Sequence, residues 1–278
     1  MMTTMVRALI YCLLGGLPLI LAALGAGHLA WWWISGIVLA AAFVPVAIYG
    51  PRGIWAQFAV IAPALFVVTV FCTWSEAMVF STRFRQNAIG NLIGAAVMYL
   101  IVAAALAVLA RVLRLTRASD AIVPHRPALM TLASIVACGF AFAVYYWIFG
   151  TITFQFFTRD FYPDALQQVA ALGGWFWPMQ IGRGMLMSAA VLPIVYTLRL
   201  PRWPAAIVVG SILWIAGGLA PLLLPNEYMG TTQRIIHIVE ILTQNAPLGI
   251  TVVLLARTNG ARAALGAYSS GSARPSTR

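Results

Sequence analysis

Eight long apolar runs, separated by short polar connections, divide this chain and restrict what it can fold into. A membrane-spanning helix needs about 20 mostly apolar residues, because each unpaired backbone polar group in hydrocarbon costs several kcal/mol. The runs that meet this requirement cover approximately residues 8–25, 29–49, 54–80, 88–110, 128–150, 175–198, 203–224 and 233–256. We therefore expect an all-α fold, a polytopic integral membrane bundle of about eight transmembrane helices within residues 1–256.

The composition excludes a soluble globular domain. Hydrophobic residues make up 62% of the chain and charged residues only 8%. A soluble domain is roughly 45–50% apolar and about 25% charged. A chain with so few polar residues cannot cover its own core with polar surface, so most of its surroundings must be lipid.

The arginines predict how the bundle is oriented. Twelve of the 17 basic residues, all of them arginines, fall on one side if the runs alternate: Arg7, Arg52, Arg111, Arg114, Arg117, Arg126, Arg199, Arg202, Arg257, Arg262, Arg274 and Arg278. Because basic connections stay in the cytoplasm, we expect both termini there, in a multi-pass protein of the cell inner membrane. Residues 257–278, rich in Gly, Ala, Ser and Arg, predict a flexible basic cytoplasmic tail.

The first run has an alternative interpretation. Arg7, the apolar residues after it and the small residues at positions 22–27 are also typical of a cleaved secretory signal. The apolar stretch is long for a signal, whose hydrophobic part is about 7–15 residues. A retained spanning helix is therefore preferred. Cleavage would leave seven spans and move only the N-terminus across the membrane.

Several kinds of partner and chemistry are not expected. The excess of arginine reflects orientation and contact with anionic lipid head groups rather than nucleic-acid binding. Cys12, Cys72 and Cys138 lie in apolar runs without CxxC spacing, and His237 is the only histidine inside a run, so neither a metal site nor another cofactor is expected. The motifs HExxH, GxSxG and the Walker loop are absent from the sequence.

The last run carries a polar stripe. Its residues Gln233, His237, Glu240 and Gln244 fall within roughly 60° of one another on a helix, with Arg234 at the edge of the stripe. In the predicted orientation this run enters from the outer side, which places Glu240 roughly 10 Å below its start. Ionisable residues at such depth normally face the bundle interior and have partners.

The sixth run carries polar residues at a matching depth. Gln180 and Arg183 follow its outer end, with Arg183 about 12 Å in. We therefore expect an ion pair between Arg183 and Glu240, since unpaired charges there would cost several kcal/mol. Gly182 and Gly184 flank the arginine and allow close approach of another helix or a bend.

Polar residues also surround the outer ends of the third and fourth runs. Glu76 lies one turn from the end of the third run, and either pairs with Arg83 or Arg85 or takes part in the same cavity. The spacing of Gly90 and Gly94 permits a tight helix contact. The aromatic connection at residues 151–168 is expected to lie in the interface or to fold back over the helices.

These patterns predict a polar, charged cavity in the outer half of the membrane, lined by the third, sixth and eighth helices. The ligand-binding candidates are Arg183, Arg234, Gln180, Gln233 and Gln244, and the proton-exchanging or catalytic candidates are Glu240, His237 and Glu76. Two function classes stay open. One is a binding, transport or membrane-complex accessory protein, in contact with lipids and with partner membrane proteins or a second copy. The other is an enzyme acting on a lipid or lipid-linked substrate from the periplasmic side, with Glu240 or His237 as general base. A purely structural ion pair is the simpler alternative.

Overall fold

The computed structural model describes residues 3–25, 27–117, 127–225 and 229–257, apart from the side chains at positions 82 and 83. Within these ranges the regular structure is entirely helical. The α-helices are α1 (Thr4–Gly15), α2 (Leu17–Ala22), α3 (Leu29–Tyr49), α4 (Ile54–Ala64), α5 (Thr73–Phe80), α6 (Thr82–Arg85), α7 (Ala88–Val112), α8 (Ala128–Tyr145), α9 (Thr151–Thr153), α10 (Ala165–Leu172), α11 (Phe176–Thr197), α12 (Arg202–Trp214), α13 (Ala220–Leu223) and α14 (Thr231–Ala256). The π-helical segments are η1 (Leu65–Cys72), η2 (Tyr146–Gly150), η3 (Phe154–Thr158) and η6 (Ile215–Leu219), and the 3₁₀ turns are η4 (Arg159–Phe161) and η5 (Gly173–Trp175).

These elements join into eight helical stretches in the described residues that are long and apolar enough to cross a membrane, which confirms the predicted number. They cover Thr4–Ala22, Leu29–Tyr49, Ile54–Phe80, Ala88–Val112, Ala128–Phe161, Ala165–Thr197, Arg202–Leu223 and Thr231–Ala256. The chain is therefore a helical, multi-pass membrane protein. Except for residue 257, the predicted tail lies outside the described residues.

The connection predicted at residues 151–168 is the main error in the spans. Helical structure continues from the fifth span through Phe161, and α10 begins at Ala165, so only residues 162–164 lack helix. Between positions 151 and 161 there is neither glycine nor proline to disfavour the helix, whereas Pro163, which lacks a backbone N–H donor, lies just beyond its end. The bulky aromatic residues that were assigned to a connection therefore belong to a continuation of the helix.

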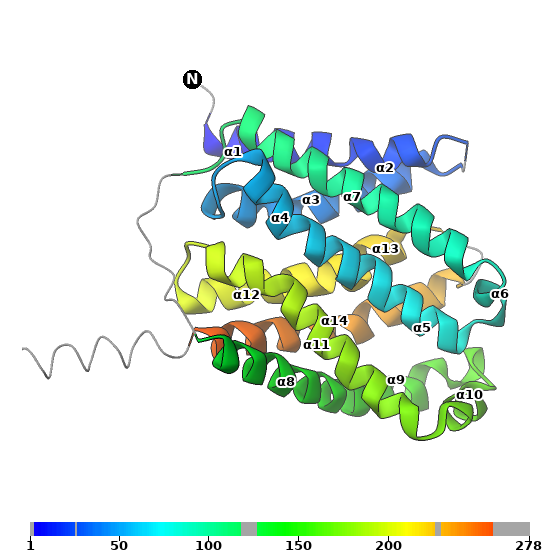
Figure 1. The fold of residues 1–278 in the computed structure, drawn as a ribbon. Helices are drawn as coiled ribbons and strands as arrows, with labels where there is room; N and C mark the ends of the chain where they lie inside the picture. Colours follow the sequence, from blue (N-terminus) through cyan, green and yellow to red (C-terminus); the bar gives the residue numbers. More distant parts are fainter. Residues whose placement is uncertain (1–2, 26, 118–126, 226–228, 258–278) are drawn as a thin grey trace, which may run out of the picture.

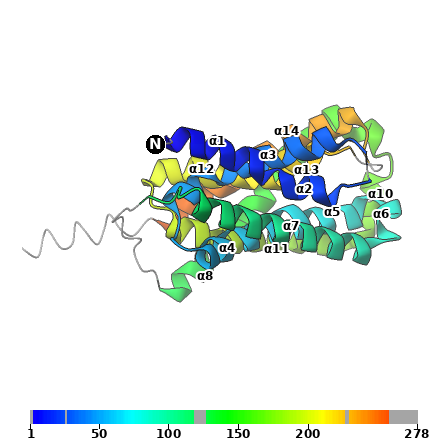
Figure 2. The ribbon, with the colours of Figure 1, turned by 90° about the horizontal axis from the view of Figure 1, so that it is seen from above.

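The bundle has two distinct ends (Figures 1 and 2). The end that holds the start of α1 and the end of α14 is called the terminal end; the opposite end, which holds α6 and α10, is called the far end. In Figure 1, α1, α2, α3 and α7 lie on one side of the bundle, while α8, α11 and α14 lie on the other. The α4–α5 and α12–α13 stretches lie between them.

The apolar core is densest toward the terminal end. Fully buried side chains such as Phe43, Leu106 and Val195 come from the halves of α3, α7 and α11 nearest that end. Tyr11, in the first span, is also fully buried. Burial of such side chains stabilises a bundle by packing rather than by exclusion from water, because lipid tails are themselves apolar. The far half of the bundle holds most of the buried polar groups discussed below.

Glycine allows two pairs of helices to approach closely. A Cβ on Gly249 of α14 would lie 2.6 Å from the Cα of Gly210 on α12, and one on Gly184 of α11 would lie 3.0 Å from the Cα of Gly139 on α8. The predicted close approach beside Arg183 is therefore made by Gly184.

The close helix contact that the spacing of Gly90 and Gly94 permits is not made at these two glycines. A Cβ on Gly94 would meet no atom within 4 Å, and the atoms nearest to one on Gly90 belong to the side chain of Asn87, three residues earlier. Small-residue spacing permits a close approach but does not require one, since a neighbouring helix must also lie over that face.

Arg257, at the terminal end, binds backbone carbonyls at the end of α11 and in the α11–α12 connection. Its guanidinium donates to the carbonyl oxygens of Leu200 at 2.7 Å and of Leu198 at 2.6 Å, and to the carbonyl of Val195 through two nitrogens. The last carbonyls of a helix have no partner within it. A planar guanidinium with several fixed donors suits such a group of acceptors.

We expect Arg257→Ala to destabilise the protein by about 1.5–3 kcal/mol, since hydrogen bonds from a charged donor are lost and half-buried carbonyls are left unpaired. Arg257→Lys should recover only part of this, because a lysine ammonium cannot reproduce the fork. The measurement is the unfolding equilibrium in a denaturing detergent titration. The control is Arg52→Ala at an exposed arginine of the same end; equal losses in Arg52→Ala and Arg257→Ala would contradict the prediction.

Candidate functional site

The buried guanidinium of Arg183 forms an ion pair with the partly exposed carboxylate of Glu76. The Arg183 Nη2 lies 2.8 Å from Glu76 Oε2, and its Nη1 donates to Gln180 Oε1 at 2.8 Å. The arginine side chain is 9% exposed and that of Glu76 is 34% exposed. The guanidinium carbon also lies 5.7 Å from the ring centre of Phe142 and 6.0 Å from that of Tyr146, a favourable arrangement for a desolvated cation.

The predicted pairing of Arg183 with Glu240 is therefore wrong. Both acids lie at a suitable depth, but α5 presents Glu76 to α11, whereas Glu240 on α14 is bonded to His237. Depth alone cannot distinguish them because it does not say which way a side chain points around its helix. Arg85, one of the partners considered for Glu76, has a weak contact to the carbonyl of Val79 at 3.5 Å instead.

His237 lies at the centre of a second group. Its Nδ1 is 2.7 Å from Glu240 Oε2, and its Nε2 is 2.9 Å from the hydroxyl of Tyr162. Gln244 donates to the other oxygen of Glu240 at 3.1 Å. An ionised carboxylate only accepts, so Nδ1 must carry the hydrogen of the first bond. Glu240 thus orients the imidazole and leaves Nε2 facing the tyrosine.

Tyr162 comes from the short connection between η4 and α10 and contacts α14 through its hydrogen bond to His237. Burial raises the pKa of Tyr162 to about 12, and the nearby charges of Glu240 and Glu76 act in the same direction. Its hydroxyl therefore keeps its proton throughout the physiological range.

Tyr146 and Gly150 place the two groups next to each other. The Tyr146 hydroxyl donates to Glu76 Oε1 at 3.2 Å. One turn further along η2, a Cβ on Gly150 would lie 3.6 Å from both Glu240 Oε1 and Gln244 Nε2. The two groups form what we call the polar cluster, which consists of Glu76, Tyr146, Tyr162, Gln180, Arg183, His237, Glu240 and Gln244.

Two of the predicted binding residues serve helix ends instead. Gln233 accepts from the backbone N–H of Gly230 at 2.8 Å and so caps the start of α14. Arg234 donates to the carbonyls of Leu222 and Leu223, both at 3.3 Å, at the end of α13. Both residues stand in the first turn of α14, where unpaired backbone groups of helix ends compete for polar side chains.

Sequence reasoning missed Tyr146 and gave Tyr162 no role. Tyr146 stands in the segment Tyr145–Tyr146–Trp147 near the predicted end of a span, where aromatic side chains usually belong to the interfacial belt. Tyr162 was one aromatic among five in the connection. No signal in the sequence separates a tyrosine that bonds a buried acid from one that faces lipid.

Several π-helical segments adjoin the polar cluster. η1 ends four residues before Glu76, and η2 begins with Tyr146 and ends with Gly150. Outside the cluster, η6 also contacts α14, where Asn245 Nδ2 donates to the carbonyl of Leu213 in α12 at 3.0 Å. π-turns are uncommon and appear frequently at functional sites. They also loosen the regular backbone bonding, which leaves carbonyls free for side chains.

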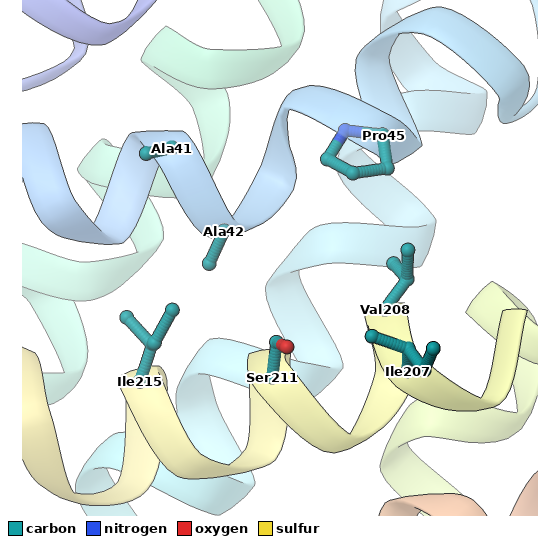
Figure 3. A pocket seen from close by; sticks show the side chains of 7 residues that line it. All are labelled: Ala41, Ala42, Pro45, Ile207, Val208, Ser211 and Ile215. Atoms are coloured by element: carbon teal, nitrogen blue, oxygen red, sulfur yellow. The ribbon is translucent and has the colours of Figure 1, made fainter. Parts of the chain in front are cut away.

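Two cavities in the described part of the chain lie away from the polar cluster. One, of about 270 Å³, lies between α3 and α12 (Figure 3) and is lined by Ala41, Ala42, Pro45, Ile207, Val208, Ser211 and Ile215. A second, of about 180 Å³, is lined by residues 85–90. Neither includes a residue of the polar cluster, whose charges compensate one another directly. Within the described part of the chain, no three His, Cys, Asp or Glu residues are placed to hold a metal ion.

The chain matches no family model, and no curated protein or solved structure is detectably similar to it.

Proposed function

We propose that the bundle lies in the cell inner membrane with its terminal end in the cytoplasm and its far end on the periplasmic side. Figure 1 brings the start of α1 and the end of α14 to one end, as eight crossings require. The arginine-rich connections belong to that same end, and the positive-inside rule favours the cytoplasm for it. Burial of Tyr11 against the bundle supports a retained first helix. In this orientation the polar cluster lies in the outer half of the membrane.

We further propose that the protein binds or transports a small polar ligand, or acts as an accessory subunit that does so with a partner. The observation that supports this proposal is that two buried hydrogen-bond donors have no acceptor. Arg183 Nε and Gln180 Nε2 are buried and have no hydrogen-bond partner among the described residues. A buried donor left without an acceptor costs about 1–3 kcal/mol. A carboxylate, phosphate or carbonyl oxygen of a ligand would satisfy such donors, and charge assistance would strengthen the bond to the arginine.

A second candidate function has its own observation. Glu240, His237 and Tyr162 form a row of carboxylate, imidazole and hydroxyl, in which an oriented base faces a hydroxyl at 2.9 Å. Activated nucleophiles are arranged in this way in many enzymes. The corresponding activity would be a reaction on a lipid or lipid-linked substrate that enters the site from the periplasmic side. Membrane lipids would supply this substrate.

The test is to identify molecules that stay bound to the protein purified in lipid nanodiscs, by mass spectrometry. We expect Gln180→Leu to weaken retention of the bound molecule about ten- to a hundredfold, the range for loss of hydrogen bonds to a charged group. The matched control is Gln167→Leu, at an exposed glutamine of α10 near the same end.

Two results would overturn the binding proposal: a wild-type protein that retains no molecule, or equal retention in Gln180→Leu and Gln167→Leu. A covalent change in the retained molecule that disappears in Tyr162→Phe would instead support the enzyme.

A further inference from the structure

We propose that His237 is an exchangeable proton site open toward the far end, and that this proton is the ion that accompanies the ligand bound near Arg183 and Gln180. The proposal rests on the proposed binding or transport function and deepens it by naming the coupled ion. Four features of the structure carry it: the bonds of the imidazole, the charges around it, the donors on Glu240 and the position of Tyr162.

The imidazole can gain or lose a proton without any heavy atom moving. Nδ1 keeps its hydrogen bond to Glu240 Oε2 at 2.7 Å in both states. When Nε2 is unprotonated it accepts from the Tyr162 hydroxyl, and when it is protonated it donates to the same oxygen, 2.9 Å away. A hydroxyl serves either role by rotating its hydrogen. Since Tyr162 stays protonated, it is always available for both.

The surrounding charges leave room for one positive charge. Among the described ionisable groups, Glu240 on the same helix and Tyr162 bind the imidazole of His237 directly. Glu76 lies further away, on the other side of Tyr146, and is paired with Arg183. Two carboxylates and one guanidinium give a net charge of −1 beside a neutral imidazole, and zero beside an imidazolium. A ligand anion at Arg183 would add further negative charge. Uncompensated charge is expensive in a membrane, so uptake of the ligand favours uptake of a proton.

The arrangement suits a proton better than a metal cation. Both oxygens of Glu240 already accept from N–H donors, one from His237 Nδ1 and one from Gln244 Nε2. Alkaline-earth ions need six or more oxygen ligands facing inward, whereas here donors surround the carboxylate. The His237 side chain is 19% exposed, and its outward partner Tyr162 belongs to the far-end connection, which gives the proton a route through the hydroxyl.

The direct test follows the imidazole by nuclear magnetic resonance. In lipid nanodiscs, the double variant His28→Asn and His125→Asn leaves His237 as the sole histidine. Labelled imidazole nitrogens should show gain of a single proton as the pH is lowered from about 9 to about 5, the range in which histidine commonly titrates. An imidazole that stays in one protonation state across this range would overturn the proposal.

Variants then test the assigned partners. Glu240→Gln should weaken proton binding at His237 about tenfold or more, because the favourable carboxylate is removed. Tyr162→Phe should also change the titration, whereas Tyr145→Phe, which breaks a bond to Thr251 elsewhere on α14, should not. A titration unaffected by both Glu240→Gln and Tyr162→Phe would contradict the site.

The outcomes separate the two proposals. A protein that retains its ligand but whose His237 does not titrate refutes the proton site alone. A His237 that titrates as expected in a protein that retains no molecule supports the proton site and refutes the proposed ligand binding.

Discussion

Glu76→Leu should destabilise the protein by about 3–5 kcal/mol, the loss measured when removal of one partner leaves the other charge buried and unpaired. The variant leaves the Arg183 guanidinium buried, with Gln180 Oε1 still accepting from Nη1. An uncompensated charge in a low-dielectric environment is the cause, rather than the lost attraction itself. The measurement is the unfolding equilibrium in a denaturing detergent titration.

A second change distinguishes this explanation from general damage to the helix. Arg183→Met in the Glu76→Leu background should recover much of the loss, since a buried ion pair can often be replaced by apolar residues of similar volume. In a double-mutant cycle, Arg183→Met should couple more strongly with Glu76→Leu than with Glu240→Leu, since Glu76 is the direct partner of Arg183. If Arg183→Met instead coupled with Glu240→Leu and was additive with Glu76→Leu, Arg183 would be paired with Glu240, as depth alone suggested.

Gly249→Val should destabilise the bundle by about 3 kcal/mol or more, at the upper end of overpacking effects. The first atom of the new side chain would lie 2.6 Å from the Cα and the N of Gly210 and 2.8 Å from the carbonyl carbon of Val209. These are backbone atoms, so α12 and α14 would have to separate. This contact lies where apolar side chains of both helices are buried, so separation also opens the core.

The matched control for this prediction is Gly94→Ala, where a Cβ meets no atom within 4 Å. That change should be neutral or stabilise by up to about 1 kcal/mol, since alanine suits a helix better than glycine. Both variants are compared by detergent unfolding and by the oligomeric state of the purified protein. Similar stabilities for Gly249→Val and Gly94→Ala would show that the α12–α14 contact is looser than the structure places it.

The spans could be predicted because hydrocarbon imposes a length and an apolar composition on every crossing segment. The second and third spans, at residues 29–49 and 54–80, agree with the structure at both ends. The fifth and sixth were predicted too short, at 128–150 and 175–198, because polar and aromatic residues beyond them were assigned to a connection. A hydropathy pattern detects where a helix leaves lipid, but not where its backbone bonding ends.

The candidate site could be predicted only in part. Glu76, Gln180, Arg183, His237, Glu240 and Gln244 were identified because ionisable and amide side chains at membrane depth must find partners. Arg234 and Gln233 were assigned to the same site, although they bond helix ends, since the sequence does not show which backbone groups lie beside them. Tyr146 was missed because aromatic side chains near the end of a span usually belong to the interfacial belt.

The amino-acid sequence by itself determined that this chain is helical, that it has eight stretches long and apolar enough to cross a membrane, and how far each polar side chain lies from the start of its stretch. Hydropathy and a rise of 1.5 Å per residue depend only on local order. Only the tertiary structure decided which polar groups meet. A π-turn accommodates an extra residue and so rotates the side chains after it by about 100° around the helix axis. With η1 before Glu76 and η2 beginning at Tyr146, the directions of these side chains depend on how neighbouring helices pack.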